Sequence, residues 1–151
     1  MNYHDLIKDS EIIEIRNGDR EEPVTDVVYN SRKAKKASMF VAIFGFATDG
    51  HEFIEDAVAH GASIVVHQAD LEKYHPDVVY IKVTDCRKML GRIANRFFGK
   101  PSQKITVTGI TGTNGKTSTT YFLCDILKRA GHKCARMGTI ENQIGDEIID
   151  N

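Results

Sequence analysis

Residues 107–118 read VTGITGTNGKTS and form the most informative stretch of the chain. A β-branched run at 105–107 leads into a glycine-rich turn, and a Lys-Thr pair then opens a region with helical spacing. Glycines let the backbone turn tightly and direct its N–H groups toward phosphate oxygens, while a helix N-terminus adds partial positive charge. This order of strand, turn and helix predicts a phosphate-binding loop for a nucleoside triphosphate.

The loop is a variant of the general phosphate-loop pattern. The common spacing G-x-x-x-x-G-K-[ST] requires glycine at position 110, where this chain has Ile110, so the match is to T-G-T-N-G-K-T. In this interpretation Lys116 supplies a full positive charge, and the Thr117 hydroxyl is a ligand for Mg²⁺. The alternative is a glycine-rich strand-to-helix turn that binds nothing.

Composition excludes several classes of protein. The chain has 151 residues, of which 41% are hydrophobic and 27% charged, as in an ordinary globular protein. Its net charge of −1 argues against binding to nucleic acid, and no apolar run approaches the roughly 18 residues of a membrane helix. The N-terminus does not resemble a signal peptide, and the three cysteines lack C-x-x-C spacing. We therefore expect three reduced, mostly buried thiols and a cytoplasmic location.

Hydrophobic periodicity predicts two α/β segments that meet near residues 98–103. In the first segment strands are expected at 26–29, 39–43, 63–67 and 78–83, with helices at about 51–60 and from Thr84 or Asp85 to Phe98. In the second, a strand at 104–108 precedes the phosphate loop, a helix follows at 116–130, and a strand at 133–137 completes a βαβ unit. Residues 139–150 form two short runs around a Gly145-Asp146 turn.

The second segment is too small to bury its own sheet. Two parallel strands and one helix leave unpaired edges and an uncovered sheet face. We therefore expect residues 102–151 to be the start of a larger parallel-sheet domain, truncated here, with self-association through its open edges as a further possibility. Residues 1–101 form a small α/β domain with its own core.

Three sequence blocks resemble the Mur ligases of peptidoglycan synthesis. The first is NSRK at 30–33, and the second is MFVAIFGFATDGHEFI at 39–54, similar to the family's FVAxxGxxxDGHxFI. The third is the phosphate loop continued by TTY at 119–121 and GTI at 138–140, which is most similar to the MurE-type ligases that add the third amino acid. Where the family usually has Gly-Asp before the second block, this chain has Ala37-Ser38.

The resemblance implies an N-terminal UDP-binding domain at 1–101 and the beginning of an ATP-binding central domain at 102–151. Carried over residue by residue, the contacts to the UDP part of the substrate are Tyr29, Ser31, Phe46, Ala47 and Thr48. The family's ATP loop corresponds to Gly112, Thr113, Asn114, Gly115, Lys116, Thr117 and Ser118, with Lys116 catalytic and Thr117 the metal ligand.

The implied reaction has two steps. ATP with Mg²⁺ phosphorylates the free carboxylate of UDP-MurNAc-L-Ala-D-Glu to an acyl phosphate, and the amine of an amino acid such as lysine or diaminopimelate then displaces the phosphate. We expect no ligation by this chain alone, since the family's downstream TTP motif, acidic metal ligand, modified lysine and amino-acid pocket are absent. The alternatives are a MurF-like ligase and a non-catalytic UDP-sugar-binding or scaffold remnant.

Two further groups of residues have competing interpretations. Arg32, Lys33, Lys35 and Lys36 form a basic cluster that is either a solvated loop or an attractant for the substrate's diphosphate. Asp49 is expected to be the N-cap of the helix that follows it, and a structural role for His51 is favoured over a contact with substrate.

Overall fold

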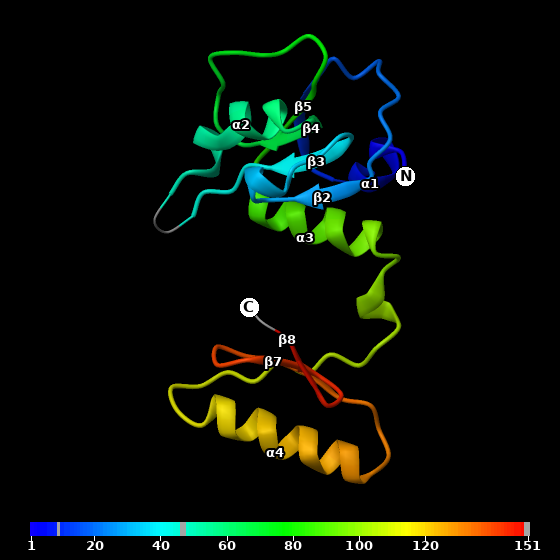
Figure 1. Ribbon diagram of the computed structural model, residues 1–151, viewed down its shortest axis with the longest axis vertical. Coiled ribbons are helices and arrows are strands. Elements are labelled where there is room, and N and C mark those ends of the chain that lie inside the picture. The colour runs from blue at the N-terminus through cyan, green and yellow to red at the C-terminus, as the bar shows by residue number, and fades with distance from the viewer. Residues whose placement is uncertain (9, 46–47, 150–151) are drawn as a thin grey trace. The chain divides into compact units, whose positions relative to one another are not determined.

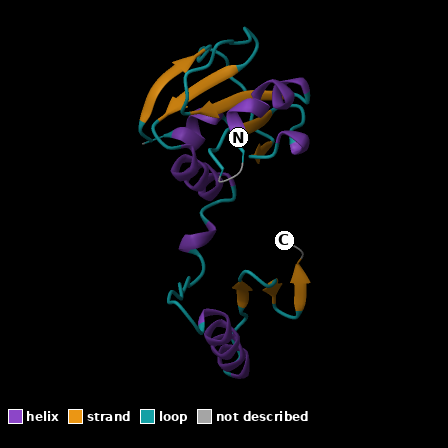
Figure 2. Cartoon of the chain, turned by 90° about the vertical axis from the view of Figure 1, so that its left-hand side faces the viewer, coloured by secondary structure: helices purple, strands orange, loops and turns teal. Residues whose placement is uncertain are grey.

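The chain divides into two compact units, Met1–Ile105 and Thr106–Asn151, each with its own helices and strands (Figures 1 and 2). The structure is a computed structural model, and it describes every residue except 9, 46–47 and 150–151. Within the described residues, no helix is long and apolar enough to cross a membrane.

The first unit is built on a five-stranded sheet in the order β1-β5-β4-β3-β2. Four neighbouring strands, β2 to β5, are parallel, and β1 pairs antiparallel with β5. The strands are β1 (Ile12–Arg16), β2 (Asp26–Val28), β3 (Ser38–Val41), β4 (Ala62–His67) and β5 (Val79–Val83). The four strands expected in this segment are thus present, and β1 adds a strand that hydrophobic periodicity did not reveal, because four of its five residues are exposed.

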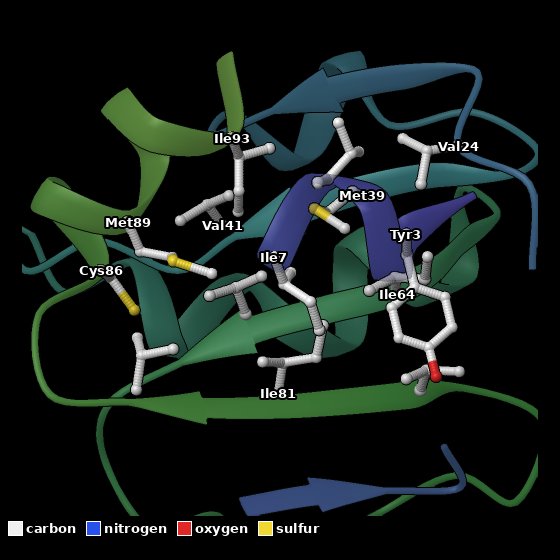
Figure 3. Packing of buried hydrophobic residues seen from close by; sticks show 14 residues of the cluster. Tyr3, Ile7, Val24, Met39, Val41, Ile64, Ile81, Cys86, Met89 and Ile93 are labelled. Atoms are coloured by element: carbon white, nitrogen blue, oxygen red, sulfur yellow. The ribbon is translucent and has the colours of Figure 1, made fainter. Parts of the chain in front are cut away.

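Helices cover both faces of this sheet. The helices of the unit are α1 (Tyr3–Ile7), α2 (Ile54–Ala59) and α3 (Cys86–Phe97), with 3₁₀ turns η1 (Ser31–Lys33), η2 (Gly50–Phe53) and η3 (Pro101–Gln103). Alternate residues of the central strands face α1 and α3 on one side, as Met39 and Val41 do (Figure 3). Phe40 and Ala42 face the opposite side, where α2 packs. A parallel sheet buried on both faces requires this nearly continuous apolar sequence.

The second unit contains α4 (Lys116–Arg129) and a three-stranded antiparallel sheet of β6 (Ala135–Met137), β7 (Asn142–Ile144) and β8 (Glu147–Ile149). The helix and the hairpin around Gly145 were expected. The strand expected at 104–108 is not formed, and β6 pairs with β7 rather than with a parallel neighbour. A strand needs a partner for its N–H and C=O groups, and no described strand runs beside residues 104–108, where Ile105 and Val107 are 64% and 70% exposed.

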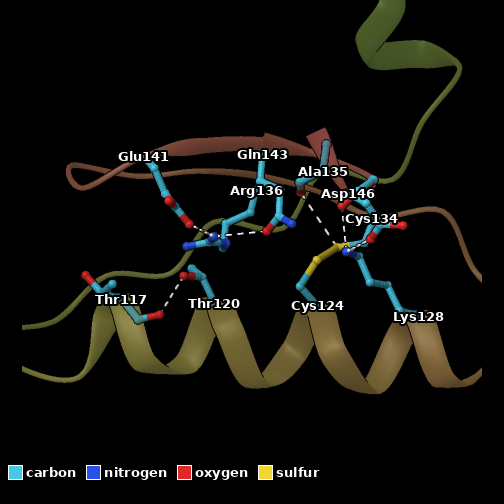
Figure 4. The surroundings of a disulfide bond; sticks show 11 residues. Thr117, Thr120, Cys124, Lys128, Cys134, Ala135, Arg136, Glu141, Gln143 and Asp146 are labelled. Carbon is cyan, nitrogen blue, oxygen red and sulfur yellow. Dashed lines mark hydrogen bonds and ion pairs between the residues drawn. A yellow bond between two sulfur atoms is a disulfide. The ribbon is translucent and has the colours of Figure 1, made fainter. Parts of the chain in front are cut away.

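The structure pairs two of the cysteines, which corrects the expectation of three reduced thiols. Cys124 on α4 and Cys134 just before β6 form a disulfide, with their Cα atoms 5.8 Å apart (Figure 4). Cys86 remains a buried thiol, and burial raises its pKa to about 12. The cross-link ties the C-terminal half of α4 to the sheet of its own unit.

Candidate functional site

The carboxyl ends of β2 to β5 meet at one edge of the sheet, because these four strands are parallel. Ligands of open parallel sheets bind in the crevice outside this edge. The segments that leave it are residues 29–33 after β2, 42–49 after β3, 68–70 after β4 and 84–85 after β5. Tyr29, Ser31 and Thr48 therefore belong to two adjacent segments at one sheet edge, although 17 positions separate Ser31 from Thr48 in the sequence.

Ser31 is held in place by the turn that follows β2. The Asn30 side chain caps this turn by accepting a hydrogen bond from the Arg32 N–H at 3.1 Å. Ser31 itself is only 5% exposed, yet its hydroxyl makes no hydrogen bond within the described part of the chain. The Ser31 hydroxyl oxygen itself stays in contact with solvent, so it is free to bond a ligand atom. Tyr29 beside it is 69% exposed.

The segment after β3 forms a tight loop that carries Thr48. The Gly45 N–H donates to the Thr48 carbonyl at 3.0 Å, and the Gly50 N–H donates to the Ile43 carbonyl at 2.9 Å. Both glycines are needed for close backbone approach, since a Cβ would lie 2.7 Å from the Thr48 oxygen at position 45 and 2.6 Å from the Ile43 nitrogen at position 50. The predicted contacts Phe46 and Ala47 lie outside the described residues.

Asp49 and His51 fasten this loop to the neighbouring strand. Asp49 is the N-cap of η2, as expected: it accepts hydrogen bonds from the His51 N–H at 2.9 Å and from the His51 ring at 2.6 Å. Burial alone raises the pKa of Asp49, but these bonds outweigh it and hold the pKa of this carboxyl below its ordinary value. The His51 ring is nearly buried, which agrees with a structural role.

The basic cluster near Ser31 is only partly engaged in ion pairs. Lys35 lies 2.8 Å from Asp26, and this partner holds the pKa of the Asp26 carboxyl below its ordinary value. Among the described residues, Arg32, Lys33 and Lys36 form no ion pair, and all three are exposed. Arg32 and Lys33, in the turn after β2, therefore lie at the edge where Ser31 is located, whereas Lys36 precedes β3 and lies at the opposite edge.

The phosphate loop has the backbone that its sequence predicts. Gly112 and Gly115 adopt φ angles of 150° and 78°, which strongly favour glycine, and α4 begins directly afterwards at Lys116. The Lys116 amine curls back over the loop and donates to the carbonyls of Gly112 at 2.5 Å and Thr113 at 3.3 Å. A cation and the N–H groups of the first helical turn thus lie on the same short segment, as a phosphate site requires.

Hydroxyl groups in the first turns of α4 divide into two kinds. Thr119 donates to the Gly115 carbonyl at 2.8 Å, and Thr120 donates to the Thr117 carbonyl at 2.7 Å. The hydroxyls of Thr117 and Ser118 make no hydrogen bond within the part of the chain that the structure describes. The two hydroxyls assigned to metal and phosphate are thus the free ones, and the donor set fits a Mg²⁺–triphosphate, in which phosphates supply further oxygen ligands.

Sequence reasoning missed a buried polar cluster that joins α4 to its sheet. The Arg136 side chain is 4% exposed and donates to Glu141 at 2.6 Å (Figure 4). Its guanidinium also lies over the Tyr121 ring, 3.3 Å from the ring centroid. This contact with Arg136 is the main reason that the pKa of Glu141 is lowered. The pattern of charged residues in this part of the sequence does not indicate that the Arg136 side chain is buried.

The parallel sheet with its open carboxyl edge and the glycine-rich turn before α4 define an α/β protein with two candidate ligand-binding segments. Sequence models of two domains match the chain: "Mur ligase family, catalytic domain" covers residues 23–98, and "Mur ligase middle domain" covers residues 110–151. The chain belongs to the Mur ligase family, whose members are ligases, and the resemblance of its sequence blocks to that family is confirmed.

Curated relatives identify the branch of the family. UDP-N-acetylmuramoyl-L-alanyl-D-glutamate–2,6-diaminopimelate ligases are 40% identical in Clostridium botulinum over 100% of this chain and 46% identical in Caldanaerobacter subterraneus subsp. tengcongensis over 83% of it. The chain spans only 31% and 26% of the lengths of these relatives. The MurE-type resemblance is therefore confirmed over about a third of such an enzyme.

Solved structures confirm the α/β fold class. A structure of a UDP-N-acetylmuramoyl-L-alanyl-D-glutamate–2,6-diaminopimelate ligase matches 98% of this chain, and 29% of its own, with a TM-score of 0.72 at 23% identity. A MurF ligase from Thermotoga maritima in complex with ADP matches 69% of this chain, and 23% of its own, with a TM-score of 0.51 at 28% identity. The MurF likeness thus covers less of the chain.

Proposed function

We propose that the chain carries the UDP-substrate site and the ATP phosphate loop of a ligase that adds the third amino acid to UDP-MurNAc-L-Ala-D-Glu. The observation that carries this proposal is the position of Tyr29, Ser31 and Thr48 at the carboxyl edge of two adjacent parallel strands. The names of the relatives support this class of substrate, with diaminopimelate as the added amino acid.

The residues at this edge make different contacts with the UDP moiety in this proposal. The free Ser31 hydroxyl donates to an oxygen of the UDP moiety, and the exposed Tyr29 ring offers an aromatic face to its base. Thr48 and the undescribed Phe46 and Ala47 complete the contacts. Arg32 and Lys33 are exposed cations that attract the diphosphate, whereas Lys35 already forms an ion pair and Lys36 lies at the opposite edge of the sheet.

We assign ATP and Mg²⁺ to the segment from Gly112 to Ser118. Bound ATP supplies the phosphoryl group that activates the substrate carboxylate as an acyl phosphate. On binding, the Lys116 amine exchanges its two carbonyl partners for phosphate oxygens, and the Thr117 hydroxyl turns to the metal. Support comes from the loop backbone, from the free hydroxyls of Thr117 and Ser118, and from the related ligase in complex with ADP.

The remaining expectations stay proposals of the same kind. A cytoplasmic location suits an enzyme of nucleotide-linked precursors. Self-association is proposed through the open strand edges of the second unit, whose sheet is β6-β7-β8. No nucleic-acid or membrane partner is proposed. A non-catalytic UDP-sugar-binding module would use the same sheet edge without the phosphate loop.

Calorimetric titration of the chain with UDP-MurNAc-dipeptide tests the UDP site. A hydrogen bond to a charged phosphate contributes about 1.5–3 kcal/mol, so Ser31→Ala lowers affinity about 10- to 100-fold. The matched control is Ser102→Ala, an exposed serine of the same unit whose hydroxyl bonds Asn95 at 3.0 Å. Equal affinities for wild type and Ser31→Ala, or no binding by wild type, contradict the proposal.

A further inference from the structure

The His51 ring connects the loop after β3 to the segment after β4 at the proposed UDP site. Its Nδ1 lies 2.6 Å from the Asp49 carboxylate on its own turn. On its other side, Nε2 lies 3.1 Å from the Gln68 backbone nitrogen and 3.3 Å from that of Ala69, directly after β4. The ring also packs against Phe44, with centroids 4.6 Å apart. No other described side chain connects the loop after β3 to the backbone after β4 through both of its polar atoms.

Donor and acceptor chemistry fixes the state of this ring. The ionised Asp49 carboxylate only accepts, so Nδ1 carries the proton, and the two backbone N–H groups only donate, so Nε2 is the acceptor. His51 is therefore the neutral Nδ1–H tautomer. A proton on Nε2 would turn a donor toward the two N–H donors of Gln68 and Ala69. The other titratable groups nearby are His67 on β4 and Cys86 and Arg87 on α3.

The connection reaches the start of α3. Gln68, whose backbone donates to His51, accepts the Cys86 N–H on its side-chain oxygen at 2.9 Å. Arg87 donates to the Phe44 carbonyl at 3.1 Å and so holds the loop after β3 from the same helix. The segments after β3, β4 and β5 are thereby linked at the sheet edge, and the His51 ring is 7% exposed at their centre.

We propose that His51 is a positioning residue of the UDP site: its neutral ring fixes the loop that carries Thr48 by anchoring that loop to the backbone after β4. This inference rests on the proposed function. The buried ring does not touch the ligand; it acts through Asp49, which it bonds and which directly follows Thr48.

Two variants separate the two halves of the anchor. His51→Gln places a carboxamide oxygen near the position of Nε2 and keeps an acceptor for Gln68 and Ala69, whereas His51→Asn keeps a donor for Asp49 and loses that acceptor. In calorimetric titration with UDP-MurNAc-dipeptide we expect His51→Asn to bind at least tenfold more weakly than wild type and His51→Gln within about threefold. Equal affinity of His51→Asn and wild type overturns the inference.

Nitrogen-detected NMR of the wild-type ring tests the same inference without a substitution. The expected spectrum shows the Nδ1–H tautomer, and its Nε2 signal shifts when the UDP compound is added. An Nε2–H tautomer, or ring signals that do not respond to the bound compound, overturns it. If the wild-type chain fails to bind the compound, the proposed function fails, and the tautomer still tests the anchor.

Discussion

Substitution of Gly50 by alanine tests whether the loop after β3 is as tight as the structure shows. A Cβ at this position lies 2.6 Å from the Ile43 nitrogen, 2.7 Å from the Ile43 oxygen and 3.2 Å from the Ala42 carbonyl carbon. All three atoms are backbone, so no side-chain rotation relieves the clash. Overpacking of this kind costs about 1–3 kcal/mol, which for a domain of about 100 residues lowers Tm by roughly 5–15 °C.

Gly91→Ala is the matched control for this substitution. Gly91 lies inside α3, and a Cβ there meets nothing within 4 Å, so alanine stabilises the helix by up to about 1 kcal/mol. Thermal unfolding is monitored by hydrogen exchange of the amides of β3 and β4, so that the Tm reports on the first unit alone. Gly50→Ala is also expected to weaken binding of the UDP compound. A Gly50→Ala Tm equal to that of wild type refutes the reasoning.

Four further predictions concern other parts of the chain. Ala37 adopts a φ of 62° where the family usually has glycine, so Ala37→Gly raises the free energy of unfolding in urea by about 1 kcal/mol, and a decrease would contradict this. Burial lowers the pKa of His67, so the unfolded chain takes up a proton that the folded unit does not, and the free energy of unfolding falls as pH drops below about 6.5. His67→Gln should lose this dependence of stability on pH, and an unchanged dependence would show that His67 is not its source. Lys116→Met should abolish calorimetric binding of Mg-ATP without changing the far-ultraviolet circular dichroism spectrum, and retained affinity would remove Lys116 from the site. Reduction of the Cys124–Cys134 disulfide should lower the free energy of unfolding of the second unit by about 3 kcal/mol in urea, and identical midpoints with and without reductant would contradict the cross-link.

Local pattern was sufficient for the elements that bury a continuous apolar face. The strands from β2 to β5 carry the apolar runs of a sheet covered on both sides, and the stripe of α3 contains Met89 and Ile93, which are buried. Elements whose existence depends on distant partners escaped this reasoning. The α1 helix has only five residues, and it is stable because Tyr3 and Leu6 dock into the core.

In the second unit, by contrast, the sequence predicted a strand that the structure does not form. Residues 104–108 have the β-branched composition of a strand, but pairing is a property of the neighbour as well as of the sequence. In the described residues that neighbour is missing, and the segment stays irregular. The disulfide was missed for a related reason: ten positions separate Cys124 from Cys134, and only the return of the chain from α4 to β6 brings their Cα atoms to 5.8 Å.

The candidate site residues differ in how much information was needed to predict them. The spacing of glycines, lysine and threonine predicts a phosphate loop from local chemistry alone, because one short segment supplies all its groups. The sheet-edge site needed the resemblance to a family, since Ser31 and Thr48 come from separate segments. Neither source revealed that the His51 ring bonds the backbone of Gln68 and Ala69, because a backbone partner leaves no sign in the sequence.

Amide chemical-shift mapping with UDP-MurNAc-dipeptide tests the central claim, that the carboxyl edge of β2 and β3 is the UDP site. The account predicts that the largest shifts fall in residues 29–33 and 44–51, with smaller shifts at Gln68 and Ala69. Residues of the opposite sheet edge, such as Lys36 and Ala62, serve as internal controls and should not move. Shifts that concentrate at that opposite edge or in the second unit would contradict the account.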